Sequence, residues 1–223
     1  MQRAKVGKFI VNYENAEEFR ELRREIWVGN AYYFETDEEA PTIIDLGAHI
    51  GLTVLYWKQL YPKAKIQAFE PNPTSFAMLA QNMVDNGIEG VELFQKAVSP
   101  RGGQLTLHED PDWRSTMGII PAGWRGIQKT KSLTVESEPI ANIIVGEISL
   151  LKMDIEGMEY EGLGAANLKR VKNIIVEVHP RAGHKSDEVE KLLRSRGFRV
   201  ERSEDKSPYG KGLAILTAAK IVI

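Results

Sequence analysis

Short apolar strands alternate with helices in two stretches of this sequence, and the alternation limits the folds that the chain can adopt. The first stretch has apolar runs at residues 42–46, 65–70 and 91–94, with helical patterns at 52–60 and 73–86. The second has apolar runs at residues 148–153, 171–178 and 213–219, a further strand expected at 198–202, and helical patterns at 157–168 and 186–196. Such alternation indicates a parallel sheet covered by helices on both faces. The pattern predicts one doubly wound α/β domain that spans residues 1–223.

Two segments fall outside the alternation. Residues 1–40 form a helical lead-in, with an amphipathic helix expected at 16–27. Residues 99–145 contain glycines, prolines and aromatic residues, with short strands expected at 104–108 and 132–135 and no clear helix. Because loops on such scaffolds carry function, this segment is expected to be an insertion over a sheet edge or over the site, where it shapes the acceptor pocket. The side chains suited to that task are Trp113, Arg114, Trp124 and Arg125, and the alternative is that the two tryptophans anchor the loop to the core.

Composition excludes several classes of function. The 29 basic and 31 acidic residues nearly cancel, so the broad positive field of a nucleic-acid-binding protein is not expected. The absence of cysteine excludes disulfides, thiolate metal sites and a cysteine nucleophile. No apolar run reaches the core of a secretory signal or the ~18 residues of a membrane span. A cytoplasmic location without membrane contact is therefore expected.

The first motif lies where the strand at 42–46 turns into a helix, and it reads Asp45-Leu46-Gly47-Ala48-His49-Ile50-Gly51. Gly47 permits a tight turn and close approach of a ligand to the backbone, and Gly51 permits close packing where the helix starts. His49 occupies the position of the second glycine of the dinucleotide-binding fingerprint, where a pyrophosphate would approach. The motif therefore disfavours a nicotinamide-dependent oxidoreductase.

An acidic residue, Glu70, ends the next strand and is followed by Pro71 and Asn72. It lies roughly 20 residues beyond the first motif, the spacing at which a carboxylate accepts both ribose hydroxyls in a doubly wound sheet. Together the two motifs predict a nucleoside ligand that lacks a pyrophosphate.

A third motif, Lys152-Met153-Asp154-Ile155-Glu156-Gly157-Met158-Glu159, places three acids at the carboxyl end of a buried strand, the edge where α/β sheets bind ligands. Clustered carboxylates are costly unless a cation, a metal or a proton lies among them. Glu177 and His179 end the next strand at the same edge. The candidate general bases are Asp154, Glu156, Glu159 and His179. A second route, Mg²⁺ held by Asp154 with Glu177 or His179, stays open but is not favoured.

Together with Ala97-Val98-Ser99, these motifs resemble the FkbM family of S-adenosylmethionine-dependent methyltransferases, and the resemblance covers about residues 42–179. It implies a Rossmann-like class I methyltransferase fold, with a seven-stranded, mostly parallel sheet whose last strand is antiparallel. It also implies O-methylation of a hydroxyl on a small metabolite, sugar or polyketide.

The resemblance also implies roles for individual residues. Gly47, Ala48 and Gly51 would line the methionine and ribose part of S-adenosylmethionine, and Glu70 would hold the ribose hydroxyls. Ala97 and Val98 would flank the adenine, and Asp154 would face the sulfonium and the acceptor. The predicted cofactor set also includes Asp45, His49, Pro71 and Asn72. The predicted catalytic set is Asp154, Glu156 and His179, with no assigned metal site. The family usually has asparagine where this chain has His49. This departure concerns the side-chain contact that the asparagine usually makes from the loop, and not the backbone turn.

The leading hypothesis is a methyltransferase with a small-molecule acceptor, in a chain that can form a homo-oligomer. One alternative is methylation of RNA or protein, which would call for a basic face or a partner domain. Another is a degenerate nucleoside-binding module without turnover. The acceptor cannot be named from fold-level reasoning, because function resides in the site and not in the fold.

Overall fold

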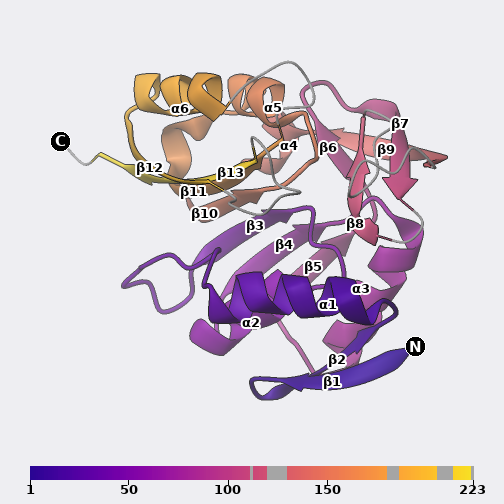
Figure 1. The fold of residues 1–223 in the computed structure, drawn as a ribbon. Coiled ribbons are helices and arrows are strands. Elements are labelled where there is room, and N and C mark those ends of the chain that lie inside the picture. Colours follow the sequence, from indigo (N-terminus) through magenta and orange to yellow (C-terminus); the bar gives the residue numbers. More distant parts are fainter. Residues whose placement is uncertain (111–112, 120–129, 180–185, 205–212, 222–223) are drawn as a thin grey trace.

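The computed structural model describes residues 1–110, 113–119, 130–179, 186–204 and 213–221, and its centre is a seven-stranded sheet (Figure 1). The strand order is β12-β13-β11-β10-β3-β4-β5. Neighbouring strands from β5 to β11 run parallel, whereas β13 is antiparallel to both of its neighbours. This confirms the predicted sheet and its antiparallel last strand. The bounds are β3 (Thr42–Leu46), β4 (Lys65–Phe69), β5 (Val91–Phe94), β10 (Ile148–Met153), β11 (Val171–Val178), β12 (Phe198–Glu204) and β13 (Ala214–Lys220).

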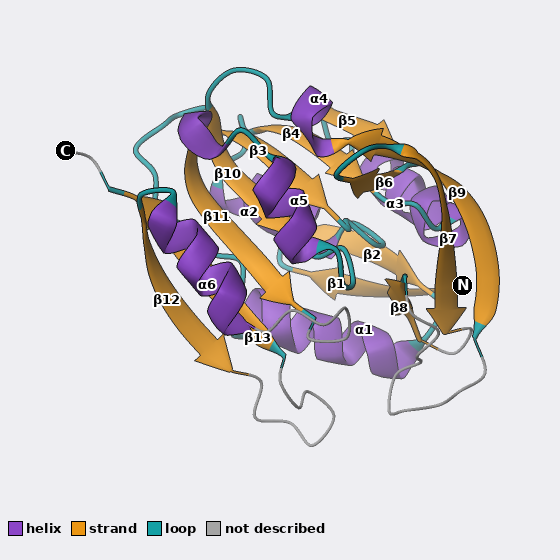
Figure 2. Ribbon diagram, turned by 90° about the horizontal axis from the view of Figure 1, so that it is seen from above, coloured by secondary structure: helices purple, strands orange, loops and turns teal. Residues whose placement is uncertain are grey.

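Helices cover both faces of this sheet, as Figures 1 and 2 show. Successive residues of a strand point to opposite faces, so Ile43 packs in one hydrophobic core and Ile44 in the other. The first core includes residues of α1 (Ala16–Arg23), α2 (Leu52–Leu60) and α3 (Pro73–Asp85). The second includes residues of α4 (Ile140–Ile143), α5 (Glu159–Ala165), α6 (Ser186–Ser195) and the short 3-10 turn η3 (Leu168–Arg170). None of the described helices is long and apolar enough to cross a membrane.

The lead-in contains more than a helix. Residues 1–13 form an antiparallel hairpin of β1 (Gln2–Val6) and β2 (Phe9–Tyr13), which the sequence analysis did not predict. The hairpin is tied to α3, because Asn82 Oδ1 accepts a 2.7 Å hydrogen bond from the Asn12 amide. The helix expected at residues 16–27 is present, but its last turn widens into the π-helical segment η1 (Arg24–Val28).

The insertion forms a second sheet of four strands in the order β6-β9-β7-β8, which lies beside the β5 edge of the main sheet (Figures 1 and 2). The strands expected at 104–108 and 132–135 are present and longer than predicted. The expectation that this segment has no clear helix is wrong, because it contains one short helix, α4, which buries Ile140 and Ile143. Trp124 and Arg125 lie outside the described residues. The strands are β6 (Ala97–Ser99), β7 (Gly103–Asp110), β8 (Trp113–Gly118) and β9 (Lys131–Pro139).

Candidate active site

The turn from β3 into α2 lies at the carboxyl edge of the main sheet and is fixed by its backbone. The amides of Gly47 and Ala48 both donate to the carbonyl oxygen of Phe69 on β4, at 2.9 and 3.0 Å. Gly47 has a φ of +82°, and a Cβ there would lie 2.1 Å from the carbonyl oxygen of Asp154. Only glycine fits this position, so the turn and the strand end that carries Asp154 are held against each other.

His49 adopts a left-handed backbone conformation, with φ 48°. Histidine and asparagine are both enriched in this conformation, so the turn accommodates the residue present here as well as the one usual in the resembled family. The His49 amide donates to Glu70 Oε2 at 2.8 Å, and its ring Nε2 lies 3.8 Å from Glu18 Oε1 on α1. The backbone of the turn is therefore coupled to Glu70, while the ring is directed to the lead-in helix.

Glu70 is 5% exposed, and each of its carboxylate oxygens accepts one backbone hydrogen bond. Oε2 accepts from His49 and Oε1 from Asn72, both at 2.8 Å. Burial raises the pKa of Glu70 from 4.5 to about 7, although the two amide donors act to lower it. Each oxygen keeps acceptor capacity, so the carboxylate can still take two ribose hydroxyls.

Asn72 joins the carboxyl edge of the main sheet to the insertion. Its Oδ1 accepts hydrogen bonds from the amides of Thr74 and Ser75, which makes it the N-cap of α3, and Pro71 precedes it half-buried. Its Nδ2 donates to Glu109 Oε1 on β7 at 2.7 Å. The insertion approaches the site a second time at β8, where a Cβ on Gly118 would lie 2.7 Å from the Glu156 carbonyl oxygen.

A cavity of about 230 Å³ opens beside the glycine turn, between α1 and the first turn of α3. His49 and Ile50 line it from the turn, Phe19 from α1 and Ser75 from α3. The Ser75 hydroxyl is buried and has no hydrogen-bond partner within the described ranges. The turn therefore borders a space into which a small polar group can be placed.

Asp45 and Lys152 form a fully buried pair beneath the turn, on adjacent positions of β3 and β10. Lys152 Nζ lies 3.2 Å from Asp45 Oδ1, and Thr53 Oγ1 donates to Asp45 Oδ2 at 2.5 Å. Burial alone would lower the pKa of Lys152, but the charges of Asp45 and Asp154 raise it above its usual value. The Asp45 side chain has 0% exposure, so any effect of this predicted cofactor residue passes through its partners.

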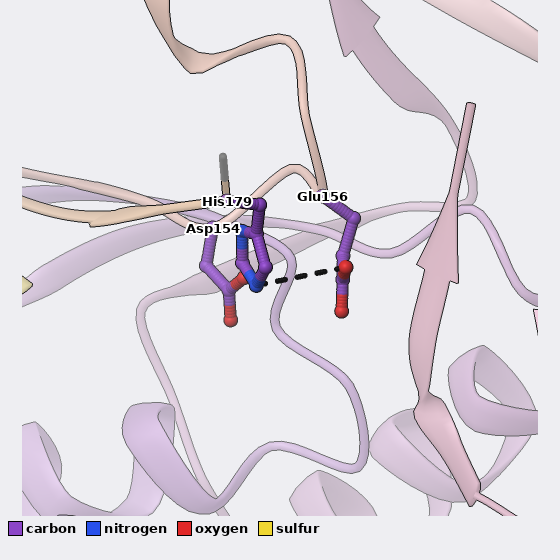
Figure 3. Close-up of side chains that lie close together, drawn as sticks. All are labelled: Asp154, Glu156 and His179. Atoms are coloured by element: carbon purple, nitrogen blue, oxygen red, sulfur yellow. Dashed lines mark ion pairs between the residues drawn. The ribbon is translucent and has the colours of Figure 1, made fainter. Parts of the chain in front are cut away.

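Asp154, Glu156 and His179 converge at the ends of β10 and β11, as Figure 3 shows. Each offers a ligand atom, and these atoms all lie within 4.8 Å of one another. His179 Nε2 lies 3.5 Å from Glu156 Oε2 and 3.7 Å from Glu177 Oε1. The structure thus brings together the whole predicted catalytic set. Two carboxylates and an imidazole suit a proton relay, and they also suit a divalent cation.

Two further carboxylates complete this cluster. Glu159 is 2% exposed, and its Oε1 lies 3.0 Å from His179 Nδ1, so it orients the imidazole. Burial would lower the pKa of His179, but Glu156, Glu159 and Glu177 together raise it well above its usual value. Burial, followed by the charge of Asp154, raises the pKa of Glu177 well above its usual value. Tyr32 of the lead-in donates to Glu177 Oε2 at 3.0 Å.

Ala97 and Val98 are not directed at this cluster. Both side chains are buried, Ala97 in the core of the insertion sheet and Val98 in the core on one face of the main sheet. They join the two sheets, and their contact with an adenine stays a prediction. The sequence analysis gave no role to two residues that shape the site, Glu109 and Lys152. Lys152 was a visible signal, because it interrupts an apolar strand. The contact of Tyr32 with Glu177 was not predicted.

A seven-stranded doubly wound sheet with one antiparallel strand, a glycine turn and acids at its carboxyl edge fits a class I methyltransferase. The family model of the methyltransferase FkbM domain matches residues 45–200. The chain therefore belongs to the FkbM methyltransferase family, and it is a methyltransferase.

Individual proteins agree with this assignment. A 31-O-demethyl-FK506 methyltransferase FkbM from Streptomyces tacrolimicus is 30% identical, with 87% of each chain covered. The methyltransferase sdnD from Sordaria araneosa is 28% identical, with 81% of this chain and 82% of its own length covered. The crystal structure of methyltransferase FkbM from Methylobacillus flagellatus KT superposes with a TM-score of 0.55 over 83% of this chain and 45% of that one. Its 14% identity makes it a likeness of fold alone.

Proposed function

We propose that this protein transfers a methyl group from S-adenosylmethionine to a hydroxyl oxygen of a small molecule or sugar. One observation carries the proposal: Asp154 belongs to both halves of the site. Its backbone carbonyl abuts Gly47 in the glycine turn, and its carboxylate lies in the cluster with Glu156 and His179. The 31-O-demethyl-FK506 methyltransferase supports oxygen as the accepting atom, because its name places the reaction at an oxygen.

The residues at the sheet edge fit this cofactor, which supplies a methyl group on a positively charged sulfur. The turn at Gly47 lets a ligand approach the backbone without a side chain between them. Glu70 supplies two carboxylate oxygens for the ribose hydroxyls. Asp154 supplies negative charge toward the sulfonium and is the most exposed acid of the cluster, at 26% of its side chain.

The chain's own part in methyl transfer is to align the acceptor and to take its proton. We assign the first hydrogen bond from the acceptor hydroxyl to the Asp154 carboxylate, because this group reaches furthest toward solvent. His179, held at Nδ1 by Glu159, presents Nε2 to the same cluster, and its neutral form takes from Asp154 the proton that the hydroxyl releases. A positioned base of this kind accelerates proton transfer by about 10²- to 10⁴-fold.

The test combines calorimetric titration with S-adenosylmethionine and a methyl-transfer assay on a panel of sugars and other hydroxyl compounds, with and without Mg²⁺. Glu70→Gln is the site variant, and Glu92→Gln, on the exposed surface of β5, is its matched control. We expect the wild type and E92Q to bind alike and E70Q to bind more weakly. An absence of binding to the wild type would refute the cofactor assignment. Transfer to nitrogen or carbon acceptors alone would refute O-methylation.

A further inference from the structure

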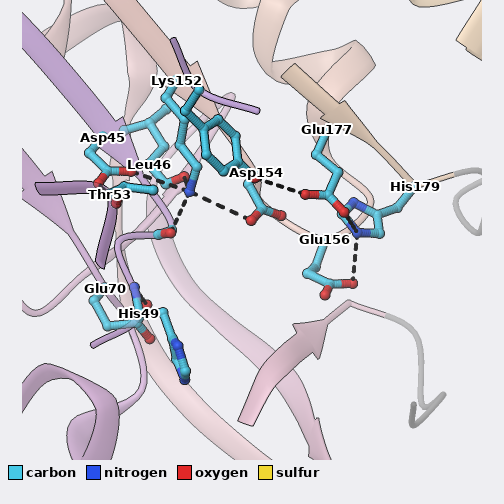
Figure 4. Close-up of polar contacts among 12 residues, drawn as sticks. Asp45, Leu46, His49, Thr53, Glu70, Lys152, Asp154, Glu156, Glu177 and His179 are labelled. Carbon is cyan, nitrogen blue, oxygen red and sulfur yellow. Dashed lines mark hydrogen bonds and ion pairs between the residues drawn. The ribbon is translucent and has the colours of Figure 1, made fainter. Parts of the chain in front are cut away.

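Lys152 is a buried ammonium that the proposed chemistry does not yet use. It lies on β10 between apolar neighbours, and its side chain is 2% exposed. Its Nζ donates to the carbonyl oxygen of Gly47 at 2.5 Å and to that of Leu46 at 3.2 Å. The same nitrogen lies 3.5 Å from Asp154 Oδ2, and Figure 4 shows these contacts radiating from one point.

A purely structural role explains this arrangement poorly. Burying a charged pair costs more than burying apolar side chains of similar volume, so an apolar residue at this position would serve the sheet at least as well. The partners of Lys152 are also not spread over the core. Two are the carbonyls that open the glycine turn, and a third is the carboxylate that we assign to the acceptor.

We propose that Lys152 is a positioning residue for the cofactor. Its ammonium ties the carbonyls of Leu46 and Gly47 to the carboxylate of Asp154, so that the turn and the acid keep one fixed spacing. Asp45 is then the counter-ion of Lys152, since its buried carboxylate contacts Lys152 and Thr53. This inference rests on the proposed function, because the geometry that Lys152 maintains is the one that would receive S-adenosylmethionine.

Two variants separate a role of Lys152 in positioning the cofactor from a role in stability. One leaves a buried charge unpaired, and the other removes both charges of the pair. Lys152→Met leaves Asp45 buried without its counter-ion and is expected to be less stable. The double variant K152M/D45N removes both charges together and is expected to recover stability in urea unfolding. Lys65→Met, at an exposed position at the start of β4, is the matched lysine control. Asp45→Asn alone keeps the ammonium and its bonds to the turn.

We expect K152M/D45N to bind S-adenosylmethionine about 10- to 100-fold more weakly than the wild type, the range for losing hydrogen bonds to a charged group. Its KM for S-adenosylmethionine should rise by the same factor. K65M should stay within a few-fold of the wild type, and D45N, which keeps the ammonium, should lose less affinity than the double variant. Recovery of both stability and affinity in the double variant would overturn the inference and leave Lys152 a structural residue. If the wild type itself fails to bind, the proposed function falls, and this inference falls with it.

Discussion

On the proposed function, we expect Glu70 to make the affinity for S-adenosylmethionine depend on pH near neutrality. Its carboxylate is 5% exposed, and burial raises its pKa to about 7. The charge of Lys152 acts to lower this pKa, and that of Asp154 acts to raise it. An ionised carboxylate accepts hydrogen bonds at both oxygens, whereas a protonated one must donate at one of them. Affinity for a ribose should therefore fall as pH falls through about 7.

The magnitude follows from the ionised fraction. With a pKa of about 7, the carboxylate is roughly one-tenth ionised at pH 6 and nine-tenths ionised at pH 8. When only one form binds, the apparent Kd is the intrinsic Kd divided by the fraction in that form. The apparent Kd for S-adenosylmethionine should thus be about 10-fold higher at pH 6 than at pH 8.

The assay is calorimetric titration at half-unit intervals from pH 5.5 to 8.5, at constant ionic strength, on the wild type and Glu70→Gln. The variant cannot titrate at this position and resembles the protonated carboxyl, so its Kd should exceed that of the wild type at pH 8 and approach it as the pH falls. The ratio of the two Kd values cancels titration of the ligand itself and of the Asp154 cluster. A ratio that stays constant across this range would refute the reasoning, because Glu70 would then bind equally well in both forms.

Three other variants test separate parts of the site. Gly47→Ala places a Cβ 2.1 Å from the Asp154 carbonyl oxygen at a φ of +82°, so it should lower the free energy of unfolding by about 2 kcal/mol or more and abolish cofactor binding. Its control is Gly164→Ala on α5, where a Cβ meets nothing within 4 Å. The Tm of this control should be unchanged or slightly higher. Glu159→Gln removes a charge that raises the pKa of His179, so the pKa of His179 should fall. The acidic limb of the pH profile of kcat/KM should then move to lower pH. A limb that does not move would exclude His179 as the base. Asn72→Ala removes the cap of α3 and the bond to Glu109, so urea unfolding should report a loss of at least about 1 kcal/mol together with weaker cofactor binding. Asn167→Ala, at the cap of η3, should lower stability without changing cofactor affinity.

The seven main strands were predictable from sequence because most of them are short apolar runs bounded by turn residues, whereas β12 has apolar residues only at alternate positions at its start. The site residues at their ends followed from one rule, that carboxyl ends of parallel strands meet at one edge. The rule placed Glu70, Asp154 and His179 together although they are far apart in the chain. The β1–β2 hairpin was missed because its buried positions do not alternate: Val11 and Asn12 are both buried, and Asn12 is held by a polar contact with Asn82.

The second sheet was predicted only in fragments for a similar reason. In β7 and β9 many positions are exposed, so burial leaves a weak signal in the residue types. Tyr32 could not be assigned either, because its contact with Glu177 joins positions that no local pattern relates. Lys152 is part of the third motif, but its role depends on hydrogen bonds to the backbone carbonyls of Leu46 and Gly47. Contacts with the backbone of a distant segment cannot be inferred from residue types.

Charge at the carboxyl edge adds a second argument, beside the shape of the turn, for the class of ligand that we propose for this site. His49 occupies the position where a pyrophosphate would approach the backbone. Asp154, Glu156 and Glu177 add negative charge at the same edge, and the raised pKa values of Glu177 and His179 mean that protons are retained there to balance it. A pyrophosphate would add to this repulsion, whereas a sulfonium would relieve it. Steric and electrostatic effects therefore act in the same direction, toward a cationic nucleoside and away from a dinucleotide.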